Sequence, residues 1–340
     1  MVSQMSVMSP VNGLRILGTG KYLPERRVAS GEIDARMGWP AGHTQARYGL
    51  DARHVAQGPE TSSMMAEAAA RQALERAGLH PQDLDLILGG CGVMEQAIPS
   101  TATLVQARLG LGASGVPAYA VNATCLSFVQ ALDLAAMKIA SGQARRVLVF
   151  AADIASVGLD WDEPDTAAIF GDGAAAVVLG ADEGGDGGIL SSRFETYGDA
   201  RDACVLEGGG TRISAAVDPQ AAVRASYFRM DGQAAFRAAA RHLPRFLRRL
   251  LGDAGVAMSD LACIVPHQAS GLALQHGLAR LGLPPERVMM TFARHGNQIA
   301  ASIPTTLDTA VTEGRLKRGQ LALILGTSAG VSIGGMVVRY

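Results

Sequence analysis

Short apolar runs alternate along the chain with longer stretches in which apolar residues recur every three or four positions. The short runs predict buried β-strands, and the longer amphipathic stretches predict helices. The predicted strands are 14–18, 84–88, 118–121, 147–151, 174–179, 261–265, 321–325 and 331–338. The predicted helices are 62–77, 126–141, 233–251, 271–281 and 299–313. This alternation indicates an α/β layered fold whose strands are mostly parallel and buried.

Two stretches of the chain resemble each other. The segments LERAGLHPQDLDLILGG and LGDAGVAMSDLACIVPH each read as a helix end, an Ala-Gly pair, a short linker and a buried strand. Their linker aspartates, Asp83 and Asp260, are 177 positions apart, and a second matching pair, Asp133 and Asp308, is 175 positions apart. The nearly constant offset favours an internal duplication. Coincidence between two common helix–strand units is the alternative.

The duplication predicts two halves, residues 1–180 and 181–340, each forming one layered α/β unit. The Gly/Asp-rich stretch 181–188 (ADEGGDGG) is the connector expected between them. In such a chain the equivalent loops of the two halves meet at the seam. A functional site is therefore expected there.

Composition narrows the possible functions. Hydrophobic residues make up 48% of the 340 residues and charged residues 18%, which is sufficient for a large buried core. A formal net charge of −1 and only 5% aromatic residues argue against nucleic-acid binding. No secretory signal is visible, and no apolar stretch reaches the roughly 18 residues that a membrane span needs. The sequence therefore predicts a cytoplasmic protein without a membrane span.

Of the four cysteines, Cys125 is the one whose position in the sequence suggests a chemical role. The other three are Cys91, Cys204 and Cys263, and none of the four lies in a CxxC pair or a zinc-type spacing, so no metal site is predicted. Cys125 lies where a buried strand ends and a helix is expected to begin. The unpaired N–H groups and the positive end of the helix dipole would there stabilise a thiolate, which is the nucleophilic form. A packed core cysteine is the alternative.

Two polar residues of the second half extend this site. His267 follows the predicted strand 261–265, and the carboxyl ends of parallel strands are where α/β proteins place function. A histidine there can exchange a proton near neutral pH. Asn297 precedes the helix that mirrors the one after Cys125. A loop histidine satisfied by a neighbour and an asparagine that only caps a helix are the alternatives.

Six motifs together resemble the β-ketoacyl-acyl-carrier-protein synthase III group of the thiolase superfamily. They are NATCLSF around Cys125, FGDGAAAVVL, MDGQAAFRAA, VPHQAS, RHGNQIAASIP and GTSAGVSIGG, in the family's order and spacing over essentially the whole chain. The resemblance implies the thiolase fold, a duplicated five-layered αβαβα arrangement, which agrees with the internal repeat. It also implies a homodimer that uses acyl-CoA or acyl carrier protein thioesters and needs no metal or redox cofactor.

The resemblance also implies roles for individual residues. Cys125 would be the acylated nucleophile, and His267 and Asn297 would bind the thioester carbonyl of a malonyl-type extender unit. The backbone N–H groups of Cys125 and Gly330 would form the oxyanion hole. The reaction implied is ping-pong acyl transfer to Cys125, followed by decarboxylative Claisen condensation with the extender.

Several positions depart from the family pattern. Members primed by acetyl-CoA typically carry a Trp near the position of His43 and an Arg near that of Pro164, and neither is present. Arg47 matches another nucleotide-contacting arginine. Ile98 stands where an aromatic residue often reaches into the partner's acyl pocket, and Ser270 replaces the Asn that follows HQA. These differences predict another acyl chain or a carrier-protein donor.

Exposed arginines predict the partner surface. Arg237 and Arg280 match family positions near the pocket mouth that meet the acidic acyl carrier protein, although an ordinary solvated face is the alternative. Acyl transfer to oxygen or nitrogen, or non-decarboxylative condensation on the same fold, remains open beside decarboxylative condensation because of the altered pocket positions. A non-catalytic partner subunit is disfavoured because Cys125, His267 and Asn297 are all present.

Overall fold

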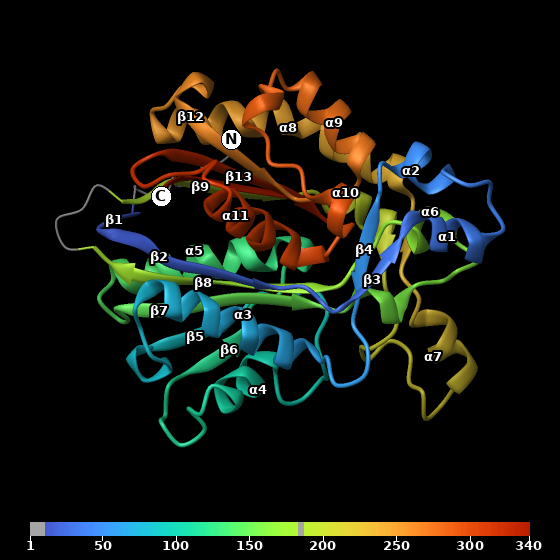
Figure 1. The fold of residues 1–340 in the computed structure, drawn as a ribbon, viewed down its shortest axis with the longest axis horizontal. Helices are drawn as coiled ribbons and strands as arrows, with labels where there is room; N and C mark the ends of the chain where they lie inside the picture. Colours follow the sequence, from blue (N-terminus) through green and yellow to red (C-terminus); the bar gives the residue numbers. More distant parts are fainter. Residues whose placement is uncertain (1–10, 183–186) are drawn as a thin grey trace.

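The protein has five layers, in the order helix, sheet, helix, sheet, helix (Figure 1). The structure is a computed structural model that describes residues 11–182 and 187–340. Over these residues it contains two five-stranded sheets and two short two-stranded ribbons. The layering confirms the thiolase-type αβαβα architecture. No helix in the described part of the chain is long and apolar enough to cross a membrane.

The first half of the chain builds a sheet with the strand order β2-β8-β7-β5-β6. Its strands are β2 (Leu14–Tyr22), β5 (Leu86–Gly89), β6 (Ala118–Ala120), β7 (Arg146–Asp153) and β8 (Gly173–Ala181). β5 is parallel to β6 and β7, whereas β8 is antiparallel to β7 and β2. Helices α3 (Ser62–Ala77) and α4 (Thr101–Arg108) cover its outer face.

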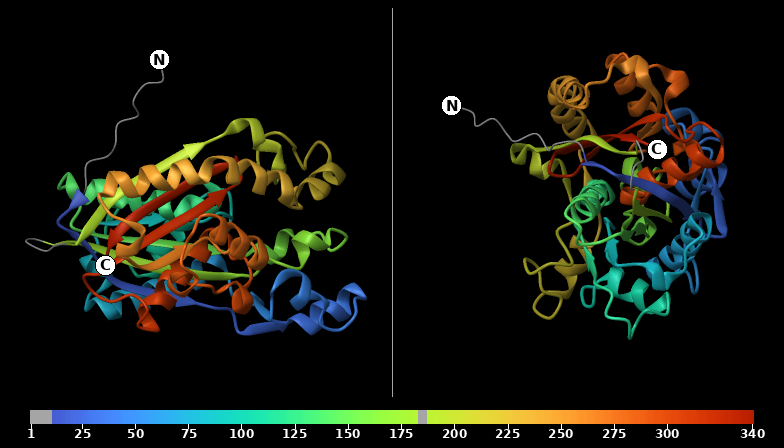
Figure 2. Two further views of the ribbon diagram at one scale, coloured as in Figure 1. Left: turned by 90° about the horizontal axis from the view of Figure 1, so that it is seen from above. Right: turned by 90° about the vertical axis from the view of Figure 1, so that its left-hand side faces the viewer.

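The second sheet has the order β1-β9-β14-β13-β12. Its strands are β1 (Val11–Asn12), β9 (Gly188–Thr196), β12 (Leu261–Pro266), β13 (Leu321–Ser328) and β14 (Ser332–Arg339). Helices α8 (Gly232–Ala254) and α9 (Gly271–Arg280) lie outside it. Figure 2 shows from above how α8 runs across this sheet, and α8 contacts β9 and β14.

The expectation of mostly parallel strands is wrong, because both sheets are mixed. In the second sheet only β12 and β13 are parallel, and β14 is antiparallel to both β13 and β9. Three residues separate β13 from β14, which is far fewer than the crossover that a parallel pair requires. The continuous apolar character of these strands reflects burial on both faces rather than parallel pairing.

The central layer consists of α5 (Ser127–Ala140) and α11 (Ser302–Thr312). Each helix follows directly on a short 3-10 turn, η2 (Thr124–Leu126) before α5 and η7 (Ile299–Ala301) before α11. Side chains of both helices, including Phe128 and Ile303, are fully buried in the core between the two sheets. The seam between the halves is therefore a packed interior, and the two turns lie within it.

The internal duplication is confirmed. The 3-10 turns η1 (Pro81–Asp83) and η5 (Met258–Asp260) are closed in the same way: Asp83 accepts the His80 N–H at 2.8 Å, and Asp260 accepts the Ala257 N–H at 2.7 Å. The boundary between the halves is less simple than residue 180, because β1 pairs with β9 of the second sheet. Residues 183–186 of the expected connector lie outside the described residues.

The predicted strands and helices are present, with ends shifted by a few residues. The chain also contains elements that were not predicted, besides β1, β9, α4 and the turns η1 and η5. They are β3 (Arg26–Ala29), α1 (Ser30–Met37), α2 (His43–Tyr48), β4 (Ala52–Val55), η3 (Ala155–Gly158), α6 (Pro164–Ala167), η4 (Gly198–Ala203), β10 (Cys204–Val205), α7 (Pro219–Ala225), β11 (Arg229–Met230), η6 (Pro285–Arg287) and α10 (Phe292–His295). Most of them are too short to show a periodic pattern. Helices α1, α2, α6 and α7 gather at one end of the molecule, on the right in Figure 1.

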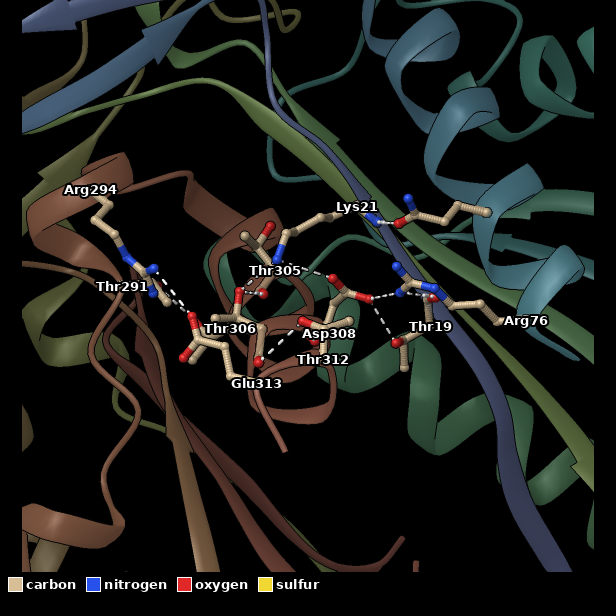
Figure 3. Close-up of polar contacts among 12 residues, drawn as sticks. Thr19, Lys21, Arg76, Thr291, Arg294, Thr305, Thr306, Asp308, Thr312 and Glu313 are labelled. Atoms are coloured by element: carbon tan, nitrogen blue, oxygen red, sulfur yellow. Dashed lines mark hydrogen bonds and ion pairs between the residues drawn. The ribbon is translucent and has the colours of Figure 1, made fainter. Parts of the chain in front are cut away.

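A buried carboxylate joins the two halves (Figure 3). The Asp308 side chain on α11 is 1% exposed and lies 3.2 Å from the Lys21 ammonium of β2. It accepts hydrogen bonds from Thr19 Oγ1 at 2.7 Å and from Arg76 Nη1 at 2.6 Å. Because two cations compensate the buried charge, this cluster holds α11 of the second half against the first sheet.

Candidate active site

Cys125 lies in the turn η2, directly before α5. Thr124, the first residue of the turn, has a φ of 51°, and Asn122 Oδ1 accepts its N–H at 3.0 Å. Ser127 Oγ accepts the Ala123 N–H at 2.9 Å. These local bonds close the turn and place the cysteine at the helix start, as the sequence indicated.

The same turn recurs 175 residues later, in the second half. Ile299 begins η7 with a φ of 52°, and Asn297 Oδ1 accepts its N–H at 2.9 Å. Asn297 is thus the mirror counterpart of Asn122. Asn297 can therefore close the turn and also take part in chemistry, because its side-chain oxygen closes the turn and its amide nitrogen remains available as a hydrogen-bond donor.

The Asn297 amide is oriented by its surroundings. Because Oδ1 faces an N–H donor, the NH₂ group must point to the other side, where Nδ2 lies 3.4 Å from the Ala269 carbonyl oxygen. An amide nitrogen carries two hydrogens, so one donor remains after this contact. The backbone of Asn297 is held by the first half: its N–H donates to Ile169 at 2.8 Å, and its carbonyl accepts the Gly171 N–H at 3.0 Å.

His267 follows β12, where its N–H donates to the Leu325 carbonyl at 2.8 Å. Its Nε2 lies 3.1 Å from the Ile299 carbonyl oxygen. A carbonyl can only accept, so Nε2 carries the ring hydrogen and Nδ1 the lone pair. The buried Nδ1 has no hydrogen-bond partner among the described residues. Burial lowers the pKa of His267 to about 4, so the imidazole is neutral at pH 7.

Ile299 links the two predicted residues of the second half. Its N–H donates to Asn297, and its carbonyl accepts from His267, at 2.9 Å and 3.1 Å. The backbone of one residue therefore sets the positions of both side chains. This arrangement was not predictable from the sequence, since Ile299 is an apolar residue whose side chain gives no hint of such a role.

Cys125 reaches the same place from the first half. The turns η2 and η7 contact each other, and Gly92 lies between them. A Cβ at Gly92 would lie 2.4 Å from Ile299 Cγ2 and 3.4 Å from the Thr124 carbonyl oxygen. A Cβ at Gly326 would likewise lie 3.0 Å from Leu126 Cδ2 and 3.2 Å from His267 Cβ. The glycines allow this close approach, and the two halves thereby bring the three predicted residues around one site.

The resting thiol of Cys125 is neutral, contrary to the expectation from the helix start. Burial is the largest effect, and together with the Asp153 carboxylate and Cys204 it raises the pKa of Cys125 to about 12. The N–H groups of Ala329 and of Cys125 itself oppose this rise without reversing it. Loss of solvent outweighs the N–H groups because the whole ionised form is desolvated, whereas they supply only partial charges.

The predicted oxyanion hole consists of the backbone N–H groups of Cys125 and Gly330. Two N–H groups act on the Cys125 sulfur, that of Cys125 itself and that of Ala329, the residue directly before Gly330. Gly330 has a φ of 137°, in the region that favours glycine. Its role as a donor stays a prediction.

The other predicted residues lie apart from the two turns. Arg47 on α2 forms an ion pair with Asp165, with 3.0 Å between Nη2 and Oδ1. Ile98 is 86% exposed, and Arg237 and Arg280 are exposed on α8 and α9. Ser270 precedes α9 and follows Ala269, whose carbonyl accepts from Asn297. It is therefore nearer to the site than the others.

Three features were missed by the sequence analysis. Asp153 ends β7 as a completely buried carboxylate, and its place at the carboxyl end of a strand was the available signal. Trp39 lies against His43 with ring centroids 4.5 Å apart, so an aromatic ring is present beside the position where the family's Trp was expected. A pocket lies next to Cys204, lined by Glu163, Thr166, Asp202, Val205, Arg229, Met230 and Asp231.

Comparison with known proteins decides the family. Residues 119–198 match the family model for 3-oxoacyl-[acyl-carrier-protein (ACP)] synthase III, and residues 251–340 match the model for its C-terminal part. The chain is 39% identical over 325 residues to β-ketoacyl-[acyl-carrier-protein] synthase III of Rhizorhabdus wittichii, covering 96% of this chain and 98% of that protein. The chain belongs to the synthase III family. It is therefore an acyl-transferring condensing enzyme of the thiolase fold, and the resemblance seen in the motifs is confirmed.

Solved structures of this family agree with the fold. The 3-oxoacyl-[acyl-carrier-protein] synthase III of Aquifex aeolicus superposes with a TM-score of 0.87 at 34% identity, covering 96% of this chain and all of that one. A priming β-ketosynthase from a polyketide biosynthetic pathway gives a TM-score of 0.88 at 29% identity, covering 98% of both chains. Residues 54–153 of this synthase also match the N-terminal domain of thiolase. In the described residues, no cluster of His, Cys, Asp and Glu is suited to hold a metal ion.

Proposed function

We propose that this synthase forms a carbon–carbon bond in two half-reactions on Cys125. In the first, the Cys125 sulfur attacks an acyl thioester, the bond between the acyl carbon and the donor sulfur breaks, and the donor leaves as a thiol with the proton from Cys125. The enzyme is left as a covalent acyl-thioester. The observation that supports this proposal is the contact between η2, which carries Cys125, and η7, whose Ile299 backbone binds both His267 and Asn297.

In the second half-reaction a malonyl-type thioester loses carbon dioxide and becomes an enolate. Its oxygen accepts a hydrogen bond from Asn297 Nδ2–H and shares the His267 Nε2–H with the Ile299 carbonyl, and its carbon attacks the acyl-Cys125 carbonyl. The bond between that carbonyl carbon and the Cys125 sulfur then breaks, and one proton from solvent restores the thiol. The product is a β-ketoacyl thioester. Each donor contributes about 3–4 kcal/mol in comparable oxyanion sites.

The protonation state of His267 fits a hydrogen-bond donor rather than a general acid. Its pKa of about 4 keeps the ring neutral at pH 7, and the neutral ring presents a hydrogen at Nε2. A neutral donor stabilises the enolate oxygen without transferring its proton. For the tetrahedral intermediate, we assign the N–H of Cys125 and a second N–H from the turn at 329–330. The effect of the Ala329 N–H on the sulfur supports Ala329, with Gly330 as the neighbouring candidate.

The surroundings of Arg47 favour an acyl carrier protein as the donor. Asp165 pairs with the Arg47 guanidinium at 3.0 Å and accepts the Tyr48 hydroxyl at 2.7 Å. A coenzyme A phosphate would have to compete with this carboxylate for the arginine. Arg237 and Arg280 are exposed on α8 and α9, whose surfaces meet where Gly277 faces Phe236, and they form the basic face for an acidic carrier protein.

A second copy of the chain is proposed to cover the edge of the first sheet. Tyr119 of the edge strand β6 is 37% exposed, and Met94 and Ile98 nearby in the sequence are 53% and 86% exposed. An open strand edge with apolar neighbours is typically paired in soluble proteins. Light scattering should therefore report a homodimer. We place the enzyme in the cytoplasm, where its thioester substrates are made.

Covalent loading followed by condensation tests the function. The protein is incubated with acyl-CoA or acyl carrier protein donors, and the mass of the peptide containing Cys125 should rise by one acyl group. Malonyl thioester is then added, and release of carbon dioxide with a β-ketoacyl product is expected. Loading without carbon dioxide release would instead favour acyl transfer to oxygen or nitrogen, or a non-decarboxylative condensation. Absence of loading would indicate a non-catalytic subunit.

A further inference from the structure

Asp153 is a buried carboxylate that the two half-reactions do not use. It is the last residue of β7 and is 0% exposed. Its Oδ1 accepts the N–H groups of Gly92 and Val93, both at 2.7 Å. Its Oδ2 accepts the N–H of Ala301 at 3.0 Å, and the Ala300 N–H faces the same carboxylate. One side chain of the first half thus binds a first-half loop and a second-half turn.

The turn that Asp153 binds is η7, which carries the Ile299 backbone. Ile299 in turn donates to Asn297 Oδ1 and accepts from His267 Nε2. A displacement of η7 would therefore move both proposed enolate donors together. The nucleophile depends on η7 much less, because the bonds that close η2 come from Asn122 and Ser127.

We propose that Asp153 is a positioning residue for the condensing half-reaction, which holds the His267 and Asn297 donors in register through η7. This inference rests on the proposed function and extends it to a residue outside the three predicted ones. Asp153 touches neither substrate nor reacting atoms in this scheme. It acts through the Ala301 N–H and the Ile299 backbone.

The duplication supports a specific role for this carboxylate. The last residue of β13, Ser328, is the mirror counterpart of Asp153, 175 positions later. Its hydroxyl donates to the Ala329 carbonyl at 3.2 Å and supplies no carboxylate to the turn η2. The acid is therefore present on only one side of the seam. This carboxylate binds η7, the turn whose Ile299 backbone contacts His267 and Asn297.

The charge of Asp153 also affects the ionisation of two nearby thiols. The N–H groups of Val93, Ala301, Gly92 and Ala300 favour its ionised form, but burial outweighs them and raises the pKa of Asp153 to about 7. The titratable side chains whose pKa it raises are Cys125 in η2 and Cys91 after β5, and Glu95 acts on Cys91 as well. Removing the charge should thus ease ionisation of Cys125 while releasing η7.

The variant Asp153→Asn separates the effect on Cys125 ionisation from the effect on the position of η7. The variant keeps the size of the side chain and one acceptor for the Gly92 and Val93 N–H groups, but an NH₂ group would face the Ala301 N–H. We expect the condensing turnover of pre-acylated enzyme to fall about 10- to 100-fold, the scale of a small misplacement of catalytic groups. Acylation of Cys125, followed by mass spectrometry, should be unchanged or faster. An equal loss in both half-reactions, or no loss in either, would overturn the proposal.

A pH profile provides a readout that general structural damage would not produce. The pKa values of His267, about 4, and Cys125, about 12, lie far from that of Asp153, about 7. Condensation by pre-acylated wild-type enzyme should therefore rise between about pH 6 and pH 8 as Asp153 ionises, and Asp153→Asn should lack this step. If the variant does not fold, the wild-type profile decides: a flat profile contradicts the proposal.

Asp133→Asn is the matched control. Asp133 on α5 is a buried carboxylate whose pKa burial also raises, and its Oδ1 has no hydrogen-bond partner among the described residues. This variant removes a buried charge without touching η7, and both half-reactions should persist. The wild-type enzyme distinguishes failure of the proposed function from failure of the positioning role. If the wild-type enzyme neither loads Cys125 nor releases carbon dioxide, the proposed function fails. If it does both and Asp153→Asn behaves identically, only the positioning role fails.

Discussion

Asn297→Ala should separate acylation from condensation. The substitution removes the Nδ2 donor that is proposed for the enolate oxygen, and it removes the Oδ1 acceptor of the Ile299 N–H at 2.9 Å. Loss of one donor of this kind lowers turnover about 10²- to 10³-fold, or about 2.7–4 kcal/mol in the transition state. Loss of the turn-closing bond costs about 0.5–2 kcal/mol of folding free energy, as for other helix-start caps. Acylation of Cys125 should persist because η2 is closed by its own bonds.

The assay uses pre-acylated enzyme. Wild-type and Asn297→Ala proteins are loaded from the same acyl donor, the acyl-enzyme is quantified by mass spectrometry, and malonyl thioester is then added in a rapid-mixing experiment. Carbon dioxide and β-ketoacyl product are measured over time. The rate constant of this chase isolates the condensing half-reaction from the loading step.

Asn122→Ala is the matched control, since it removes the mirror-related bond to the Thr124 N–H at 3.0 Å. Asn122 is exposed whereas Asn297 is 5% exposed, so its loss should cost less folding free energy. Its turn carries Cys125, and any kinetic defect should therefore appear in acylation. The reasoning would be refuted if Asn297→Ala condensed at the wild-type rate, or if Asn122→Ala showed the same condensation-specific loss.

Further predictions concern stability, substrate choice and pH. Asp308→Ala should lower the free energy of unfolding by about 3 kcal/mol, the lower end for a broken buried ion pair, because Lys21 and Arg76 stay partly solvated; chemical denaturation measures it. Asp165→Ala removes the carboxylate that competes for Arg47. The KM for acyl-CoA should therefore be lower in the variant than in the wild-type enzyme, whereas the KM for acyl carrier protein donors should change less. Arg237→Glu with Arg280→Glu should weaken carrier-protein binding, most at low salt. The Cys125 acylation rate should rise about tenfold per pH unit from pH 7 to 9, because its pKa is near 12.

Much of the fold could be predicted from local pattern. The offset between Asp133 and Asp308 indicated the duplication, and both residues lie at equivalent places on α5 and α11. The apolar runs located the central strands because full burial leaves a continuous hydrophobic signature. Strand direction was not predictable in the same way, since it depends on connection length and pairing partners. The small elements at the far end of the molecule were too short for any periodic signal.

The sequence by itself predicted which residues carry the proposed chemistry, and it placed Cys125 and Asn297 at related helix starts and His267 at a strand end. Cys125, His267 and Asn297 could be selected because their positions relative to strand ends and the repeat are local properties of the chain. Only the tertiary structure decided which groups surround them. It packs η7 against β7, where Asp153 accepts the Ala301 N–H and the Ile299 backbone binds both Asn297 and His267. It also places the half-buried Cys125 where loss of solvent raises the pKa of the thiol to about 12. Desolvation and cross-half hydrogen bonds arise from residues far apart in sequence, and no local pattern encodes them.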